Sequence, residues 1–326
     1  MYRSHEKDWH ISQSDQLLGA TELVDALSVD VEDYFQVEAF SSQIPISAWP
    51  QFPLRVRENT LRVLDLFEEC DCRATFFILG WVAERDPALV REIAMRGHEL
   101  ACHSFHHQQV FKLTPGEFRA DLRRGRAAIE DASGTQIKGY RAPTFSIRRD
   151  SLWALEILAE EDFLYDSSIF PIRHDLYGIP DAVRFVHRRD FPGGGSIIEV
   201  PLSTARWGGI NWPAAGGGVL RLLPMSYTRS VIRRMHRRDH QPAVLYFHPW
   251  ELDPEQPRLN GGWRSRFRHY TGLKHMENRL RVLLHQGRYE PLIDMVRRVG
   301  LSMDPALPHL LPVRNGISFG QVSSSL

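Results

Sequence analysis

The sequence has few cysteines, no excess of either charge and no long apolar run, and each of these shortages narrows the class of protein. Three cysteines occur in 326 residues, which excludes a disulfide framework and favours a reducing compartment. Lysine plus arginine and aspartate plus glutamate both number 40. Because binding to a phosphate backbone needs a basic excess, nucleic acid is not an expected partner.

The hydropathy pattern predicts no transmembrane segment, because no apolar run approaches the roughly 18 residues that a span requires. The first eight residues, MYRSHEKD, are polar and contain no signal-peptide core. We therefore expect a cytoplasmic protein, with peripheral contact to the inner membrane left open. The sequence does not predict the oligomeric state.

Short apolar runs typical of strands alternate with amphipathic segments typical of helices. The expected strands cover residues 24–29, 74–79, 98–102, 137–140, 163–165 and 243–247. The expected helices cover residues 57–69, 87–96, 115–133, 151–158, 226–238 and 289–299. This alternation predicts a parallel α/β architecture. We expect a flexible arm at residues 1–20, one domain at 21–300 and a tail at 301–326.

A cluster of three histidines, His103, His106 and His107, follows one of the predicted strands. Neutral imidazole is the commonest metal ligand, and residues four apart on a turn can point at one ion. His103 and His107 are therefore predicted to bind a metal, whereas His106 is expected to be exposed or to lie behind the ligands. A run of surface histidines is the alternative interpretation.

Charged residues stand directly after five of the predicted strands, namely Asp30, His103, Arg141, Asp166 and His248. The C-terminal ends of parallel strands meet at one edge, where barrels of this kind keep their catalytic residues. Two histidines and a carboxylate leave a metal ion open to water and substrate, and a second carboxylate can act as a base. The pattern predicts a hydrolase of an amide or an ester.

Over about residues 24–250, these motifs resemble those of the polysaccharide deacetylase family, which contains the NodB-homology domain. Its H-[ST]-x-x-H, Arg-x-Pro and aspartate motifs correspond to residues 103–107, 141–143 and 165–167, its Leu-x-His motif corresponds to 245–248 with one extra residue, and its TFF strand corresponds to 75–77. The chain is most similar to the subgroup found at exopolysaccharide and exosortase loci. Residues 247–253, FHPWELD, resemble that subgroup's C-terminal extension, which we place at about residues 180–300.

The resemblance implies a distorted (β/α) barrel with seven or eight parallel strands and a deacetylase site. In the implied site, Asp30 is the general base and Arg141 orients it. His103 and His107 bind the metal. His248 is the general acid, and Asp166 controls its tautomer and charge.

The carboxylate ligand is the point at which the chain departs from the family. Many members carry two adjacent aspartates in a T-F-D-D motif, whereas residues 28–33 read S-V-D-V-E-D. Residues two apart in a strand share a face, so Glu32, which lies on the face of Asp30, is predicted as the third ligand. Asp33 is the rival. In a third interpretation Asp33 binds Arg141 or a backbone amide and touches no metal.

Together these residues predict a hydrolase that depends on a divalent metal, expected to be zinc, and removes N-acetyl groups from a glycan. The predicted substrate is a bacterial exopolysaccharide or its lipid-linked precursor. The alternatives are a hydrolase of a small amide or cyclic imide, and a catalytically silent carbohydrate-binding or assembly protein. Sugar stacking or core packing is expected of Tyr34, Phe35, Trp207, Trp212 and Trp250.

Overall fold

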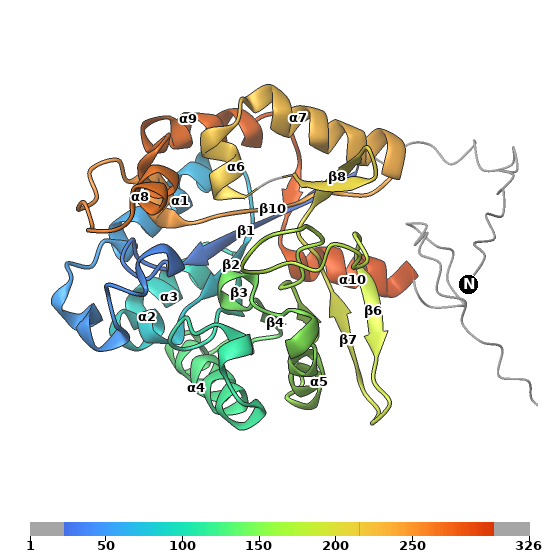
Figure 1. Ribbon diagram of the computed structural model, residues 1–326, viewed down its shortest axis with the longest axis horizontal. Helices are drawn as coiled ribbons and strands as arrows, with labels where there is room; N and C mark the ends of the chain where they lie inside the picture. Colours follow the sequence, from blue (N-terminus) through green and yellow to red (C-terminus); the bar gives the residue numbers. More distant parts are fainter. Residues whose placement is uncertain (1–22, 215, 303–326) are drawn as a thin grey trace, which may run out of the picture.

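The structure is a computed structural model that describes residues 23–214 and 216–302, and its centre is one curled sheet (Figure 1). The predicted arm at residues 1–20 and residues 303–326 of the predicted tail lie outside the described part. The sheet has nine strands in the order β10-β1-β2-β3-β4-β5-β7-β6, with β11 beside β1. Only β6 runs antiparallel to its neighbour, so eight strands are parallel, as the predicted architecture requires. Among the described residues no pairing joins the edge strands β10 and β6, and the barrel is an open half-barrel.

The strands have short and unequal lengths. They are β1 (Asp25–Val31), β2 (Thr75–Ile78), β3 (Glu99–Cys102), β4 (Gly139–Tyr140), β5 (Tyr165–Asp166), β6 (His187–Asp190), β7 (Ser196–Glu199), β8 (Thr204–Trp207), β9 (Ile210–Pro213), β10 (Val244–Phe247) and β11 (Tyr289–Glu290). The strands β8 and β9 form a separate hairpin.

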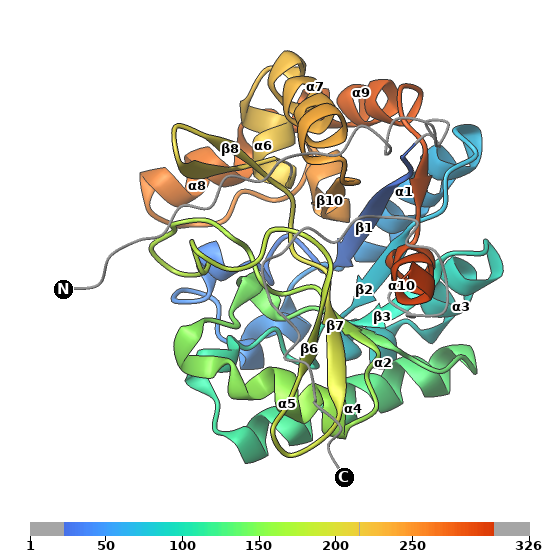
Figure 2. The ribbon, with the colours of Figure 1, turned by 90° about the vertical axis from the view of Figure 1, so that its right-hand side faces the viewer.

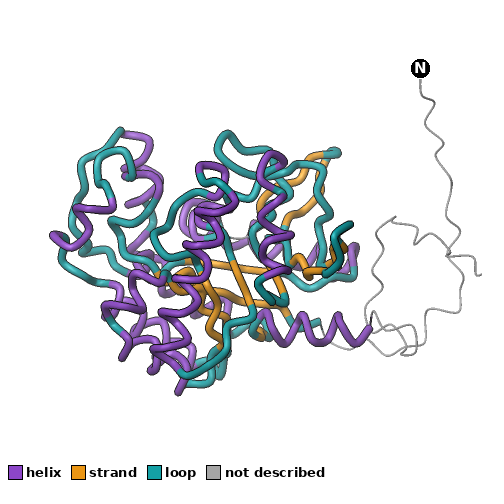
Figure 3. Tube along the Cα trace, turned by 90° about the horizontal axis from the view of Figure 1, so that it is seen from below, coloured by secondary structure: helices purple, strands orange, loops and turns teal. Residues whose placement is uncertain are grey.

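Helices surround the sheet (Figures 1 and 3). The α-helices are α1 (Val56–Glu69), α2 (Gly80–Arg85), α3 (Pro87–Met95), α4 (Pro115–Ser133), α5 (Trp153–Glu160), α6 (Gly217–Leu222), α7 (Met225–Arg234), α8 (Trp263–Tyr270), α9 (Leu273–Leu284) and α10 (Leu292–Ser302). Short 3-10 turns include η2 (Glu38–Phe40) and η8 (Pro249–Leu252). Figure 2 shows α10 seen end-on beside the strands. No helix in the described part of the chain is both long and apolar enough to cross a membrane.

Local sequence signals set several helix ends. The Asp86 side chain accepts a hydrogen bond from the Leu89 amide at the start of α3. Thr114 and Glu117 form a reciprocal capping box at the start of α4. Helix α4 ends at Gly134, whose φ of 70° is accessible to glycine without strain.

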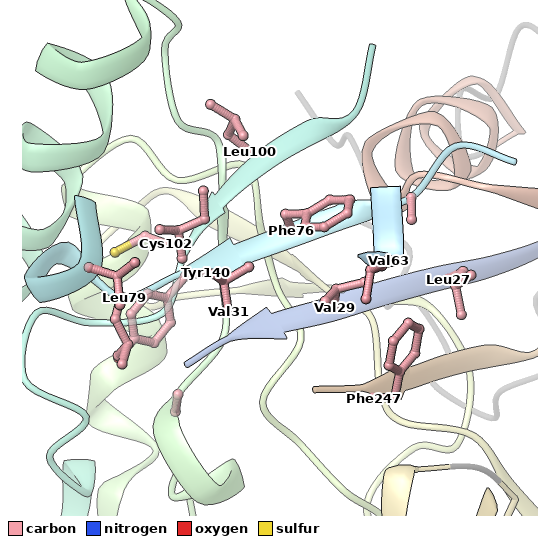
Figure 4. Packing of buried hydrophobic residues seen from close by; sticks show 14 of the residues in the cluster. Leu27, Val29, Val31, Val63, Phe76, Leu79, Leu100, Cys102, Tyr140 and Phe247 are labelled. Atoms are coloured by element: carbon pink, nitrogen blue, oxygen red, sulfur yellow. The ribbon is translucent and has the colours of Figure 1, made fainter. Parts of the chain in front are cut away.

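The alternation along β1 separates the core from the site. Leu27, Val29 and Val31 pack with Phe76 of β2 in the main hydrophobic core (Figure 4). Because successive residues of a strand face opposite sides, Asp30 points to the other face of the sheet, where a polar cluster is built. Register with β2 and β10 therefore fixes the direction of the Asp30 carboxylate.

Some predicted elements need correction. The last helix was predicted from Tyr289, but Tyr289–Glu290 form β11 and the helix begins at Leu292. The predicted helix at 226–238 is α7 followed by a π-helical turn, Met235–Asp239. The sequence did not predict β6, because its HRRD sequence has no apolar alternation.

A buried carboxyl group, Glu99 at the start of β3, links the sheet to α10. It accepts hydrogen bonds from the Tyr165 hydroxyl, the Thr75 hydroxyl and the Ile293 amide. Burial is the largest influence on this group and raises its pKa to about 7. The folded state therefore binds a proton that the unfolded chain has released, and the corresponding stability is lost as the pH rises toward and through 7.

We expect Glu99→Gln to change the pH dependence of stability in a defined direction. Urea unfolding measures the free energy of unfolding of both proteins. Between pH 5 and pH 8 this free energy should rise in the variant, relative to the wild type, by about 1–3 kcal/mol, because about 1.4 kcal/mol accompanies each pKa unit. A constant difference between the two proteins across this pH range would show that Glu99 is ionised throughout.

Candidate active site

The pocket at the C-terminal edge of the sheet collects the polar residues predicted from the strand ends. It has a volume of about 170 Å³. Its lining includes the polar and charged side chains of Asp30, Glu32, His103, His107 and His248 and an aromatic wall that consists of Phe145, Tyr177, Tyr246 and Trp250. Five segments that are far apart in the sequence therefore supply one cavity.

Glu32, His103 and His107 form the only cluster of metal-binding geometry among the described residues. One donor atom from each lies within 4.8 Å of the others, and all three side chains are buried. The Glu32 Oε2 atom has no hydrogen-bond partner within the described chain, although the His107 Nε2 atom is only 2.8 Å away. A buried carboxylate oxygen and an imidazole nitrogen that face each other in this way fit two ligands of one cation.

A strained turn directs the two histidines. Ser104 has φ 66° and His107 has φ 56°, values that are uncommon for residues other than glycine. The Ser104 hydroxyl accepts a hydrogen bond from the His107 amide at 3.0 Å, which holds the turn. His103 donates its Nδ1 proton to the Arg141 carbonyl at 2.8 Å, so its Nε2 atom keeps a free lone pair. Burial lowers the pKa of His103 to about 4, which keeps the imidazole neutral.

The carboxylates of Glu32 and Asp33 point in different directions. Asp33 accepts hydrogen bonds from the backbone amides of Arg55 at 2.7 Å, Val56 at 2.9 Å and Tyr34 at 2.9 Å. It anchors the start of α1, as the third interpretation of Asp33 describes, and Glu32 takes the place beside the histidines. Burial alone would raise the pKa of Glu32, but the neighbouring histidines, chiefly His107, outweigh it and lower the pKa to about 2.

Asp30 and Arg141 make the ion pair that the sequence predicted. The Arg141 Nη1 atom lies 2.7 Å from Asp30 Oδ1 and also donates to the Ser28 hydroxyl at 2.8 Å. Arg141 is fully buried, and its guanidinium lies 4.0 Å from the centre of the Phe77 ring. The planar, permanently charged group therefore fixes the Asp30 carboxylate in one orientation.

His248, which follows β10, stands between three carboxylates. Its Nε2 atom lies 3.4 Å from Glu32 Oε1 and 3.9 Å from Asp30 Oδ2, and its Nδ1 atom lies 3.4 Å from Glu251 Oε2. Burial lowers the pKa of His248, but these carboxylates, led by Glu32, outweigh it and raise the pKa to about 9. The imidazole is therefore held in its protonated form.

The predicted partnership of Asp166 with His248 is wrong. The Asp166 carboxylate instead accepts hydrogen bonds from the hydroxyl and the amide of Ser168 at 2.6 and 3.0 Å. Burial raises its pKa to about 6 and also raises the pKa of the adjacent Glu199. The carboxylate that contacts His248 Nδ1 is Glu251.

Glu251 reaches His248 because the two residues lie three apart in the turn that contains η8. Its Oε2 atom also accepts the His248 amide at 3.0 Å, and its Oε1 atom accepts from Arg221 Nε of α6 at 2.7 Å. Burial raises the pKa of Glu251, but Arg221 and then His248 outweigh it and lower the pKa to about 2. The spacing of His248 and Glu251 was the sequence signal for this pair, whereas Arg221 carried no signal.

The five aromatic residues predicted to stack on sugars or to pack in the core lie in different parts of the structure. Tyr34 and Phe35 are buried in the core, and Trp212 is 47% exposed on β9. Trp207 packs against the main core. Trp250 alone of the five lines this pocket, where it stacks on His248 with 5.2 Å between ring centroids.

Trp250 also contacts the metal-site carboxylate, because its indole Nε1 donates to Glu32 Oε1 at 3.3 Å. If the cluster binds a divalent metal, we expect Trp250→Phe to weaken that binding about 10- to 100-fold, the usual cost of losing a hydrogen bond that orients a ligand. Isothermal titration of the chelated protein measures this change. Trp81→Phe, which alters an equally buried tryptophan outside the site, is the matched control, and equal affinities in all three proteins would contradict the contact's role.

The fold and the site together define an α/β half-barrel with a candidate metal centre beside Asp30 and His248 at the C-terminal edge of its parallel strands. Comparison with known families agrees with this class. Residues 49–159 match the family described as polysaccharide deacetylase, and residues 167–297 match a domain of unknown function, DUF3473. The first match shows that residues 49–159 are similar to polysaccharide deacetylases.

Curated relatives are similar over part of the sequence. A bifunctional xylanase/deacetylase of Pseudobutyrivibrio xylanivorans is 33% identical over 90 residues, which is 27% of this chain and 15% of the relative. A peptidoglycan-N-acetylglucosamine deacetylase of Bacillus cereus is 32% identical over 100 residues, which is 30% of this chain and 36% of the relative. A chitooligosaccharide deacetylase of Rhizobium leguminosarum is 26% identical over 153 residues, which is 46% of this chain and 62% of the relative. The chain thus spans less than two thirds of each relative.

A solved structure supports the fold over nearly the whole described chain. A crystal structure of a protein from Mycobacterium smegmatis superposes with a TM-score of 0.59 at 20% sequence identity. The alignment covers 86% of this chain and 94% of the other.

Proposed function

We propose that this protein is a metal-dependent deacetylase that removes N-acetyl groups from sugars of a bacterial exopolysaccharide or of its lipid-linked precursor. The observation that carries the proposal is the joint placement of Glu32, His103 and His107 with Asp30 and His248 in one pocket. The matches to polysaccharide deacetylases support the class of reaction.

The donor set fits a divalent cation, and we propose zinc. Two neutral imidazoles and one carboxylate leave coordination positions open, as catalytic zinc sites do. When bound, the ion would polarise the acetamide carbonyl and acidify water. Glu32, His103 and His107 would hold it, and Trp250 would orient Glu32.

The remaining residues handle the protons of amide hydrolysis. Asp30, oriented by Arg141, accepts a proton from the water whose oxygen forms the new bond to the acetyl carbon. His248 then donates its proton to the sugar nitrogen as the carbon–nitrogen bond breaks, and acetate and a free amine result. Glu251 stabilises the protonated His248 before the transfer and fixes the direction of its ring.

Acetate release from N-acetylglucosamine oligomers tests the function. We expect release by the zinc-loaded protein, loss of activity after chelation, and recovery on return of zinc. Turnover of cyclic imides with no release from any N-acetylated glycan would instead support the small-amide alternative. Full activity in the chelated sample would contradict the metal-dependent mechanism.

We further propose that residues 21–300 act as one domain in the cytoplasm. The parallel pairing of β10 and β11 with β1 supports the single domain, because strands from the second half of the chain complete the sheet of the first half. Fractionation of cells that produce the full chain tests the location.

A further inference from the structure

The outer face of α8 is an exposed surface that the proposed reaction does not use. Trp263 is 75% exposed and Phe267 is 57% exposed. Because these residues lie four apart in a helix, their side chains occupy the same face. Large aromatic groups left in water in this way mark an interaction surface when charged residues surround them.

The segment that carries these two side chains is basic. Residues 256–276 contain five cationic and no acidic side chains, the cations being Arg258, Arg264, Arg266, Arg268 and Lys274. Arg264, Arg266 and Arg268 of α8 itself are exposed. An amphipathic helix with tryptophan or phenylalanine on one face and arginines around it is typical of a segment that lies in a bilayer interface.

The inner face of α8 is fixed to the catalytic site. His269 is buried and stacks on Trp250 with 4.2 Å between ring centroids, and Trp250 in turn stacks on His248. The ring centroids of His269 and Phe40 of η2 lie 5.1 Å apart. Figure 1 shows α8 beyond the C-terminal end of β1.

The charge of helix α8 also acts on the aromatic wall of the pocket. Burial raises the pKa of Tyr177, and the charge of Arg268 opposes that rise. Tyr177 lines the catalytic pocket. The exposed aromatic pair therefore lies on a helix whose buried His269 stacks on Trp250, and Trp250 in turn stacks on His248.

We propose that α8 docks the protein onto an anionic membrane surface, with Trp263 and Phe267 in the interface and the arginines facing lipid phosphates. The exposed arginines complement that charge, and the protruding aromatics suit insertion rather than a groove for another chain. The proposal rests on the proposed function only for its purpose, which is access of the pocket to a lipid-linked glycan.

Co-sedimentation of the full chain with vesicles tests this surface. We expect binding to vesicles that contain equal shares of phosphatidylcholine and phosphatidylglycerol, and little binding to phosphatidylcholine alone. Trp263→Ser/Phe267→Ser should weaken binding about tenfold or more because it removes the inserted apolar area. Arg264→Ala/Arg266→Ala should weaken it about tenfold, because each basic residue near an anionic surface contributes to binding.

The charge-matched control is Arg233→Ala/Arg237→Ala, which removes two exposed arginines from the segment of α7 and the turn after it. We expect this control to bind nearly as well as the wild type. Equal loss in both arginine variants, or unchanged binding of Trp263→Ser/Phe267→Ser, would overturn the proposal. A wild-type dimer that is lost in Trp263→Ser/Phe267→Ser would also overturn the proposal, since the face would then bind a second copy of the chain.

Acetate release from soluble N-acetylated oligomers separates docking from catalysis. The Trp263→Ser/Phe267→Ser variant should retain this activity while it loses vesicle binding. A wild-type protein that binds anionic vesicles without releasing acetate would uphold docking and remove the proposed function. A wild-type protein that releases acetate without binding anionic vesicles would uphold the proposed function and overturn docking.

Discussion

Asp30→Asn is expected to lower kcat for acetate release by about 10²- to 10⁴-fold, the range that a general base contributes. The amide cannot accept the proton from water, although it can keep one hydrogen bond to Arg141, which lies 2.7 Å from Asp30 Oδ1 in the wild type. The loss should appear in kcat rather than in KM, because Asp30 acts on the transition state. Initial rates with an N-acetylated oligomer measure it.

The zinc content of Asp30→Asn provides the control for this prediction. Because the three proposed ligands are Glu32, His103 and His107, we expect the variant to bind zinc as the wild type does. A variant that keeps its zinc and its full kcat would show that another group is the base.

Glu251→Gln is expected to lower kcat by about 10²-fold, within the range for general acid catalysis. The substitution keeps the size of the side chain but removes the negative charge that stabilises protonated His248. The matched variant Asp166→Asn should have a much smaller effect, because the Asp166 carboxylate contacts Ser168 and not His248.

The comparison of these two variants decides which carboxylate supports His248. Circular dichroism and thermal unfolding establish that both proteins are folded before their rates are compared. A larger loss of kcat in Asp166→Asn than in Glu251→Gln would contradict the arrangement in the structure and restore the role first predicted for Asp166.

The sequence predicted much of the fold because strong local signals and strand order agree. The capping box at Thr114 and the cap at Asp86 define helix starts, and the apolar strands give the parallel order. Elements without such signals were missed. The strand β6 is charged, and α8 carries its aromatic residues on an exposed face, so neither shows the expected apolar pattern.

The structure brings the predicted site residues together where strand geometry alone decides position. Asp30 lies in β1 and Glu32 directly follows it, and strand ends brought His103, Arg141 and His248 to the same edge. The partner of His248 could not be obtained in this way, because a parallel barrel places Asp166 at the same edge without fixing where its side chain turns. Glu251 contacts His248 through a local turn, and Arg221 reaches Glu251 only through tertiary packing.

The most direct measurement of the central claim is zinc content together with acetate release in His107→Ala and His106→Ala. These variants change adjacent histidines, but only His107 belongs to the three-residue cluster. We expect one zinc per chain and normal release in the wild type and in His106→Ala, and loss of both in His107→Ala. Zinc and activity that survive in His107→Ala, or disappear equally in both variants, would contradict the proposed metal centre.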